Sequence, residues 1–412
     1  MAGISTDNRW IRRGPGAAIG ACALALLLGP PSAGAALEPV AGELGGGHTA
    51  RSAAAYWTPE RMRATAPIEL RSEAPLFDGP AAIAAKRVPF MSKELGNTTA
   101  DPNRIHGKIF AEYPGLGEYS CSGTVIASES KSLLTTAGHC VFDAGASNQF
   151  SNNFVFVPGY KDGSAPFGVW PAASGITTGE WARRASLDYD SAFVRLQPNT
   201  QGTGVEDVIG ARGVGFNQER RQRYEAYGYP AAPAKKFNGE RLIRCTSRAV
   251  RDFPHSRQPS VGLGCDMKGG SSGGGWVIQK TFVVSSVSHG HPPQVKNISF
   301  GPYYGDAVKA LYTAKQPGYR STGPYTCNGR VGTLIATNRN ETIRGTSGKD
   351  VIITRGGNDL IRAGAGKDII CAGDGNDRII AGGGRDVINA GAGRDVCKGG
   401  KGKTKKAGCE RG

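Results

Sequence analysis

Three short motifs carry side chains that together could transfer an acyl group. The first, TTAGHC at 135–140, holds His139; the second, DYDSAFV at 188–194, holds Asp190; the third, GGSSGGG at 269–275, holds Ser272. A neutral imidazole can take a proton from a hydroxyl, a carboxylate can orient that imidazole, and the deprotonated serine is a nucleophile. The chemistry requires that elements far apart in the sequence bring the three groups together.

The glycine-rich motif has the properties that a nucleophilic serine needs. The serine must lie on a tight turn with backbone N–H groups facing the developing oxyanion, and glycines allow such a turn while leaving the amides open. A Gly/Ser run is more often a linker. Here, however, it lies between Cys265 and an apolar stretch that begins at Trp276, where a linker has no purpose.

These motifs resemble those of the chymotrypsin-like serine proteases, in which the histidine lies in a T-A-x-H-C run and the nucleophile precedes Gly-Gly. The pattern favours Ser272 over Ser271, and Asp190, which precedes an apolar strand, over Asp188. The chain order histidine, aspartate, serine is also that of this family. The resemblance implies an all-β fold with a double antiparallel β-barrel, a peptide substrate and no catalytic cofactor.

The same resemblance assigns further roles. It implies a disulfide between Cys121 and Cys140, which are 19 residues apart (140 − 121), and an oxyanion site formed by the N–H groups of Gly270 and Ser272. It also implies that Ser288, in VSHG at 287–290, supports the aspartate and that its backbone pairs with substrate.

The specificity of the site stays open at this stage. Ser271 replaces the aspartate that receives a freed N-terminus in digestive members, which makes the motif more similar to the bacterial glutamyl-endopeptidase branch. Asp266, six residues before Ser272, would favour a basic substrate side chain. His289 and His291 would instead favour an acidic one.

A strict nine-residue period fills the C-terminal region. Isoleucines keep the same step as the aspartates at Asp350, Asp359, Asp368, Asp377, Asp386 and Asp395. The region resembles RTX-type repeats, which implies a small parallel β-roll whose aspartates bind Ca²⁺. Lys349, Lys367, Arg385 and Arg394 interrupt the turns, so the number of ions remains open.

The composition indicates an exported protein. A charged start, a short apolar run and small residues predict a signal peptide, and no other stretch could span a membrane. Eight cysteines remain after its removal, and an even number in an oxidising compartment predicts disulfides: Cys121, Cys140, Cys245, Cys265, Cys327, Cys371, Cys397 and Cys409. We therefore expect a signal peptide at 1–35, a pro-segment or linker at 36–103, a protease domain at 104–318 and a repeat domain at 319–412.

Half of the net charge of +16 lies in the last quarter of the chain, where 17 Lys and Arg stand against 9 Asp and Glu from Tyr319 onwards, a surplus of 8 (17 − 9). This surplus would attract anionic cell-surface polymers, although it could equally serve solubility alone. Nucleic acid is not expected as a partner, because no binding module for it is present. Two functions stay open here: a secreted endopeptidase, or an inactive protease-like protein used for binding or adhesion outside the cell.

Overall fold

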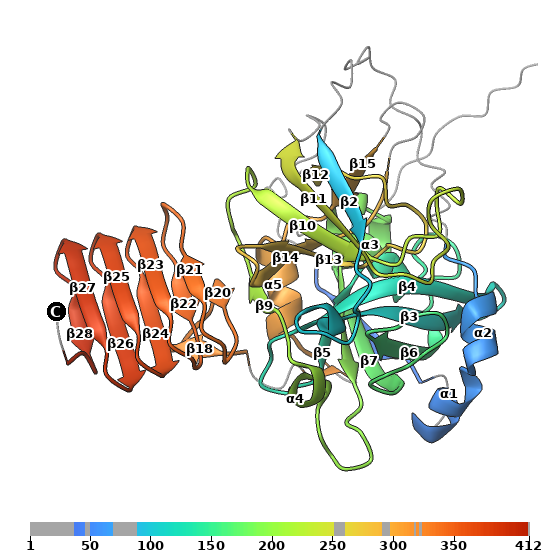
Figure 1. Cartoon of the computed structure of the whole chain (residues 1–412), viewed down its shortest axis with the longest axis horizontal. Coiled ribbons are helices and arrows are strands. Elements are labelled where there is room, and N and C mark those ends of the chain that lie inside the picture. The colour runs from blue at the N-terminus through green and yellow to red at the C-terminus, as the bar shows by residue number, and fades with distance from the viewer. Residues whose placement is uncertain are drawn as a thin grey trace, which may run out of the picture. The chain divides into compact units, whose positions relative to one another are not determined.

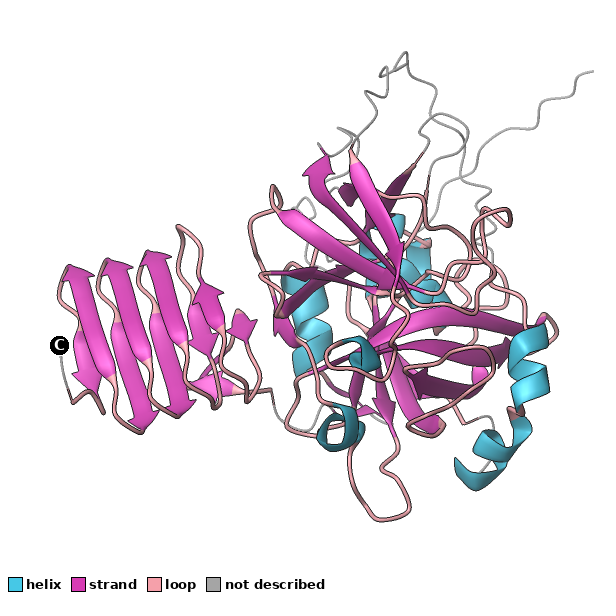
Figure 2. Ribbon diagram, viewed as in Figure 1, coloured by secondary structure: helices cyan, strands magenta, loops and turns pink. Residues whose placement is uncertain are grey.

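Two β-barrels and a β-solenoid make up the computed structural model (Figures 1 and 2). It describes residues 37–45, 50–68, 89–250, 260–290, 297–316, 319–320 and 324–410. The predicted signal peptide and His291 lie outside these residues. Within them, no helix is long and apolar enough to cross a membrane.

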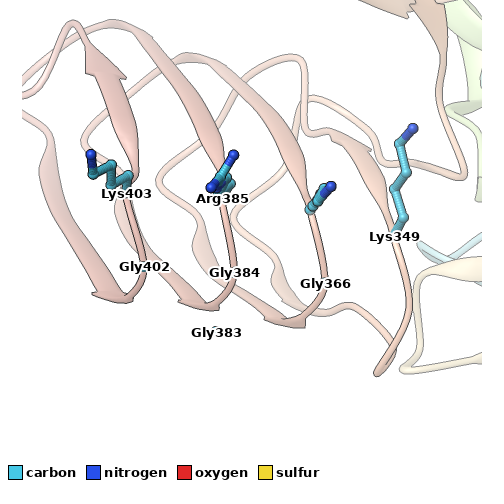
Figure 3. A pocket seen from close by; sticks show the side chains of 8 residues that line it. Lys349, Gly366, Gly383, Gly384, Arg385, Gly402 and Lys403 are labelled. Carbon is cyan, nitrogen blue, oxygen red and sulfur yellow. The ribbon is translucent and has the colours of Figure 1, made fainter.

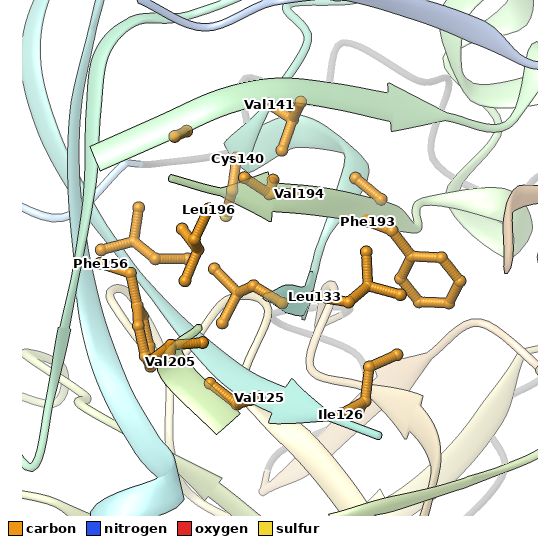
Figure 4. Packing of buried hydrophobic residues seen from close by; sticks show 14 of the residues in the cluster. Val125, Ile126, Leu133, Cys140, Val141, Phe156, Phe193, Val194, Leu196 and Val205 are labelled. Atoms are coloured by element: carbon orange, nitrogen blue, oxygen red, sulfur yellow. The ribbon is translucent and has the colours of Figure 1, made fainter. Parts of the chain in front are cut away.

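The first barrel closes from six antiparallel strands: β3 (His106–Tyr113), β4 (Gly117–Ile126), β5 (Leu133–Thr136), β6 (Asn152–Pro158), β7 (Trp170–Thr177) and β8 (Ala192–Leu196). The order β3-β4-β5-β8-β7-β6 returns to β3 through the pairing of β6 with β3. Branched and aromatic side chains fill its interior, among them Val125, Phe156 and Phe193, all fully buried (Figure 4). Such close packing makes the barrel a rigid support for the loops at its rim.

The second barrel-like sheet follows: β9 (Gly213–Gly215), β10 (Arg223–Gly228), β11 (Ile243–Val250), β12 (Val261–Gly264), β13 (Gly275–Ile278), β14 (Phe282–Ser286) and β15 (Ile298–Gly301). Its strands are hydrogen-bonded in the order β15-β12-β11-β10-β13-β14-β9. All neighbours are antiparallel except β14 and β9. The all-β prediction and the two antiparallel sheets of the protease-like region are therefore confirmed.

Short helices occupy the connections: α3 (Gly179–Arg184), α4 (Val205–Ile209), α5 (Asp306–Thr313), and the 3₁₀ turns η1 (Asn103–Ile105), η2 (Gly138–Cys140) and η3 (Leu187–Tyr189). Two of the 3₁₀ turns, η2 and η3, present His139 and Asp190. Thr178 caps α3, because its hydroxyl accepts a hydrogen bond from the Trp181 amide. This cap fixes the helix beside both turns.

The described part of the expected pro-segment or linker, residues 37–45, 50–68 and 89–103, contains regular structure and buried apolar side chains. It contains β1 (Val40–Glu43), α1 (Ala50–Tyr56), α2 (Pro59–Ala64) and β2 (Phe90–Glu94), where β1 pairs with β7 and β2 with β11. The large apolar side chains of this segment are buried: Leu44, Trp57 and Met62 are 0%, 2% and 2% exposed. Strands of the expected pro-segment or linker therefore pair with both sheets of the protease-like region.

The C-terminal repeats coil into two parallel stacks. One contains β20 (Leu334–Ile335), β22 (Val351–Ile353), β24 (Ile369–Asp374), β26 (Val387–Ala392) and β28 (Lys405–Ala407); the other contains β21 (Thr342–Arg344), β23 (Leu360–Ala365), β25 (Arg378–Gly383) and β27 (Val396–Lys401). Successive repeats alternate between the stacks, so one full turn takes 18 residues, as in the pairing of Ile352 with Ile370. The isoleucine ladder is buried between the stacks, which confirms the predicted β-roll.

Backbone pairing joins the repeats to the second barrel. Val214 of β9 pairs with Ile335 of β20, so that the barrel sheet continues into one stack of the solenoid. Four two-residue strands precede or flank this junction: β16 (Lys315–Gln316), β17 (Tyr319–Arg320), β18 (Thr326–Cys327) and β19 (Arg330–Val331). The pairing of β9 with β20 covers the edge of the barrel sheet, which would otherwise expose unpaired backbone groups.

All eight predicted cysteines form disulfides: Cys121–Cys140, Cys245–Cys265, Cys327–Cys371 and Cys397–Cys409. The sequence did not predict which cysteines pair in the last two bonds. Cys327–Cys371 links β18, which precedes the repeats, to β24 of the solenoid, and Cys397–Cys409 links β27 to the C-terminal residues. Such cross-links lower the conformational entropy of the unfolded chain, and they thereby stabilise a solenoid whose apolar core is narrow.

Candidate active site and metal sites

His139 is held rigidly behind β5. The turn η2 buries the imidazole to 3% exposure, and the neighbouring Cys140 is tied to β4 through Cys121. Gly138 has to be a glycine, because a Cβ there would lie 2.7 Å from Trp181 and 2.9 Å from Asp190 Oδ1. The Trp181 ring packs edge-on against the imidazole at 6.1 Å between centroids. The sequence alone gives no signal for this contact.

Asp190 lies directly behind the histidine. It is fully buried, and its Oδ1 accepts the His139 backbone N–H at 2.8 Å while its Oδ2 lies 2.7 Å from His139 Nδ1. Burial by itself raises the pKa of this carboxyl. The charge of His139 and hydrogen bonds from His139 and Ser288 outweigh burial, so the pKa falls below its usual value. Because an ionised carboxylate only accepts, Nδ1 is the donor in this contact, and Nε2 faces away from Asp190.

Ser272 lies in the turn before β13, where it is 8% exposed. Its carbonyl accepts the Ser122 N–H at 2.7 Å, and the next amide, of Gly273, donates to Val287 at 2.7 Å. Gly270 and Gly273 adopt φ of +90° and +82°, which side chains rarely tolerate. A Cβ at Gly273 would also overlap the Thr136 hydroxyl.

Two amides in this turn point to no acceptor. The N–H groups of Gly270 and Ser272 make no hydrogen bond with any part of the chain that the structure describes, whereas those of Gly273 and Gly274 do. His139 Nε2 is likewise buried and without a partner among these residues. The site thus holds an imidazole nitrogen and two backbone donors without partners in the described chain, which are the groups that acyl transfer requires.

Ser122 is a residue whose role the sequence did not reveal. Its hydroxyl donates to the Gly270 carbonyl at 2.7 Å and accepts the Tyr229 N–H at 2.9 Å. Together with the hydrogen bond from the Ser122 amide to the Ser272 carbonyl, these bonds hold the turn that contains Ser272 against β4. The adjacent Cys121 marks the position in sequence, but only the fold shows what the hydroxyl binds.

Five of the six repeat aspartates are held in the same way. Their Oδ1 accepts the backbone N–H of the acidic residue one turn earlier, as Asp368 does from Asp350 at 2.9 Å, whereas Asp350 Oδ1 accepts the Thr333 hydroxyl at 3.2 Å. The second oxygens are buried and have no partner within the described residues at Asp359, Asp368, Asp377, Asp386 and Asp395. Burial raises the pKa of Asp359 to about 7 and those of Asp368 and Asp377 to about 6.

Asp350 differs from the other five. Its Oδ2 accepts hydrogen bonds from the Thr346 amide at 2.7 Å and the Thr346 hydroxyl at 2.9 Å. Unpaired buried carboxylate oxygens are costly unless a proton or a cation satisfies them. The five orphaned oxygens thus fit a hard cation such as Ca²⁺, whereas Asp350 is already satisfied by the protein.

Two solved proteases are similar in sequence to about half of this chain. Protease Anisep from Arthrobacter nicotinovorans is 34% identical over 54% of this chain and 97% of its own, with a TM-score of 0.48. The thermostable serine protease AL20 from an extremophilic microorganism is 38% identical over 51% and 95%, with a TM-score of 0.47. The chain belongs to the chymotrypsin-like serine protease family.

A Glu endopeptidase in complex with MPD is more distantly similar: it is 20% identical over 54% of this chain and 94% of its own, with a TM-score of 0.43. Residues 335–370 and 372–403 match the RTX calcium-binding nonapeptide repeat (4 copies). A search of curated proteins found no match. The predicted family and the predicted repeat type are both confirmed.

The candidate specificity residues of the protease lie in different surroundings. Asp266 is 9% exposed, and one of its oxygens accepts a hydrogen bond from Lys236. His289 is half-buried, stacks on Phe300 at 5.5 Å between centroids, and its Nδ1 lies 2.9 Å from Ser288 Oγ. Ser288 also donates to Asp190, so Ser288 links His289 to the Asp190 carboxylate, whereas no such link joins Asp266 to it within the described residues.

Proposed function

We propose that the chain is an exported serine endopeptidase in which His139, Asp190 and Ser272 form the catalytic triad. The observation that carries the proposal is the pair of hydrogen bonds from His139 to buried Asp190, which orient the imidazole while its Nε2 has no partner among the described residues. The family membership supports the same chemistry. No cofactor is needed for this reaction.

The proposed reaction follows from the protonation states. His139 Nε2 takes the proton of the Ser272 hydroxyl as Oγ bonds to the carbonyl carbon, and the N–H groups of Gly270 and Ser272 bind the oxyanion. His139 then gives the proton to the amine as the C–N bond breaks. Water repeats the sequence on the acyl-enzyme and releases the acid. Asp190 stays ionised and stabilises the imidazolium.

An acidic substrate side chain is the preference we favour. Lys236 already neutralises Asp266, which leaves little negative charge for a basic side chain. His289 is a partly exposed imidazole in contact with Ser288, and in its protonated form it can donate to a carboxylate ligand. Digestion of a peptide library tests this: His289→Gln should reduce cleavage after acidic residues, and Asp266→Asn should leave the preference unchanged. Cleavage after Lys or Arg would contradict it.

The repeats would bind calcium through the aspartates with unpaired oxygens: Asp359, Asp368, Asp377, Asp386 and Asp395. A bound ion would neutralise these carboxylates and so stabilise the turns that hold them. The expected boundaries fit this organisation, with a signal peptide at 1–35, a pro-segment at 36–103, the protease at 104–318 and the repeats at 319–412. The excess of basic residues in the repeats supports an anionic partner outside the cell.

Labelling with a fluorophosphonate probe tests the enzyme proposal, because such probes react only with an activated serine. The wild-type chain should be labelled, Ser272→Ala should not, and Ser271→Ala should be labelled like the wild type. Ser271 is the matched control, since it lies in the same turn and is 1% exposed. A folded wild type that resists labelling would favour the inactive binding protein instead.

A further inference from the structure

One row of turns in the solenoid carries a basic residue at the same position in every turn. Lys349, Lys367, Arg385 and Lys403 are spaced by 18 residues and precede strands that pair in register, Val351 with Ile369, Ile369 with Val387 and Val387 with Lys405. Figure 3 shows the side chains of Lys349, Arg385 and Lys403 along one side of the solenoid. Adjacent turns are about 4.8 Å apart, so the row is about 14 Å long.

The opposite row of turns shows that this position can serve the fold instead. Asn340, Asn358 and Asn376 occupy it there, and each side-chain oxygen accepts the backbone N–H of the next turn at 2.7–2.8 Å. A lysine or arginine cannot accept a hydrogen bond. The basic row has therefore given up a stabilising ladder, which points to another use of its side chains.

These four cations are exposed and free to bind. They form no ion pair or side-chain hydrogen bond within the described part of the chain. Between them lies a hollow of about 680 Å³ floored by Gly366, Gly383, Gly384 and Gly402, which have no side chains. The carboxylates of Asp368 and Asp386 point inward and are at most 1% exposed, so they cannot pair with the row at the surface.

We propose that this basic row, defined as Lys349, Lys367, Arg385 and Lys403, binds a linear polyanion with closely spaced charges. A row of cations at a repeat of about 4.8 Å suits an extended polymer with phosphate or carboxylate groups along one side. Binding should strengthen with calcium, since an ion on the underlying aspartates removes their negative charge. That last effect rests on the proposed calcium sites; the binding itself does not.

The test measures binding of the full-length Ser272→Ala chain to polyphosphate, polygalacturonate and neutral dextran by titration. Replacing the four basic residues by glutamine should weaken polyanion binding roughly tenfold or more and flatten its salt dependence. The matched control replaces four other exposed cations, Arg362, Arg378, Lys398 and Lys405, with the same change of charge. Binding of one polyanion but not the other identifies the anionic group.

Two results would overturn the proposal. One is equal weakening by the control, which would mean that the overall charge attracts the polymer and the row does not. The other is no binding of either polyanion at low salt. Circular dichroism of both variants, with and without calcium, verifies that the solenoid remains folded.

A second, independent feature lies beside the active site. Strand β4 pairs with β3 along one side, but with β5 only from Thr124 to Ile126 on the other. The remaining free edge is occupied by residues 66–68: the Ser120 N–H donates to Ala66 at 2.8 Å, and the Ile68 N–H donates to the Ser120 carbonyl at 3.1 Å. Pro67, which has no N–H, lies between these two bonds.

The same edge of β4 contacts the nucleophile. Ser122, two residues after Ser120 and facing the same way, donates its N–H to the Ser272 carbonyl. Pro67 also lies against the glycine turn, 3.3 Å from where a Cβ of Gly270 would be. Cys121, between Ser120 and Ser122, is disulfide-bonded to Cys140, which is next to His139. In the proposed reaction His139 gives its proton to the leaving amine, so the substrate residues after the scissile bond lie on this side.

The occupying residues are firmly anchored. Trp57 is 2% exposed and donates its indole N–H to the Asn153 carbonyl at 2.7 Å. Arg61 and Tyr56 both bind Glu118 of β4 at 2.6 Å. The helix α2 that carries Arg61 ends at Ala64, so the chain from Thr65 leads directly to the free edge.

We infer that residues 66–68 block the leaving-group side of the substrate cleft until they are displaced. This inference rests on the proposed peptidase function. Substrates that extend beyond the scissile bond would compete with residues 66–68 for the β4 edge, whereas a substrate with only a small leaving group would not.

Two substrates separate this role from a structural one. The full chain should hydrolyse an acyl-nitroanilide, yet cleave a quenched peptide with several residues beyond the scissile bond poorly. Replacing residues 66–68 by glycines should raise kcat/KM for the peptide roughly tenfold and change the nitroanilide rate less than about twofold. Glu60→Gln with Arg63→Gln, in exposed positions of α2, is the control.

The outcomes distinguish this inference from the proposed function. A chain that a fluorophosphonate labels, but whose ratio of peptide to nitroanilide hydrolysis is unchanged by the glycines, refutes the blocking role alone. A chain that the probe does not label refutes the peptidase proposal and the blocking role with it.

Discussion

Ser288 Oγ donates a hydrogen bond to Asp190 Oδ2 over 2.6 Å, on the same oxygen that faces His139 Nδ1. This bond helps to keep the pKa of Asp190 low. Ser288→Ala should therefore raise that pKa and weaken the orientation of His139. We expect kcat/KM to fall roughly tenfold and the acid limb of its pH profile to move to higher pH.

Ser285→Ala is the control for this variant. Ser285 is equally buried, but its hydroxyl donates to the Pro302 carbonyl and does not face the triad. Equal pH profiles for the wild type and Ser288→Ala would show that the serine acts only in packing.

Calcium removal should destabilise the repeats. In the proposed sites the orphaned oxygens lose their cation and five buried carboxylates repel one another. Chelation should lower the melting temperature of the repeat transition; an ion at one hundred times its Kd contributes about 2.7 kcal/mol per site. Asp377→Asn should reduce the calcium response, whereas Asp374→Asn, exposed and outside the nine-residue series, should not. Identical melting curves with and without calcium would exclude these sites.

Acid should destabilise the protease through His106. The ring is fully buried, stacks on Tyr227 at 3.8 Å and has an unpartnered Nε2, and burial with the charge of Arg212 lowers its pKa well below 6.5. The folded state holds the neutral form, so this contribution to stability is complete above pH 6.5 and is lost as the pH falls below it, by up to about 1.4 kcal/mol per pH unit.

Urea unfolding between pH 7.5 and 5 measures this dependence. His106→Gln, which keeps a hydrogen-bonding group towards Thr124, should flatten the curve over that interval. A variant that is as acid-sensitive as the wild type would assign the effect to other groups.

The triad and the repeats were predictable from the sequence because each is encoded locally. His139, Asp190 and Ser272 lie in short runs whose glycines and small residues are fixed by the turns that hold them, and the period of Asp359 and Asp377 is visible without a structure. What a period cannot show is that alternate repeats face opposite ways. For that reason only the structure shows that Lys349 and Lys367 lie in the same row of turns.

Contacts between distant segments were not predictable. Nothing near Asp266 in the sequence indicates that Lys236 will bind it, and nothing in residues 66–68 indicates that they pair with Ser120. The burial of Trp57 likewise depends on a core built by strands that follow much later. Such pairings depend on geometry set by the whole barrel rather than on a local pattern.

The ion pair between Glu206 of α4 and Arg355 of the repeats should contribute to their attachment. The atoms lie 2.7 Å apart and both side chains are 7% exposed. Removing one partner leaves the other charge buried, so Glu206→Gln should destabilise the chain by about 3 kcal/mol. The double variant with Arg355→Met should recover part of that loss in urea unfolding. Additive losses would mean that the two residues are not coupled.

Trapping of the acyl-enzyme is the most direct test of the central claim. The full chain is mixed with an activated ester, quenched in acid within its first turnover and analysed by intact mass and peptide mapping. The account predicts one acyl group on the peptide that contains Ser272, and none in Ser272→Ala. An acyl group on another residue, or equal acylation of Ser272→Ala, would contradict it.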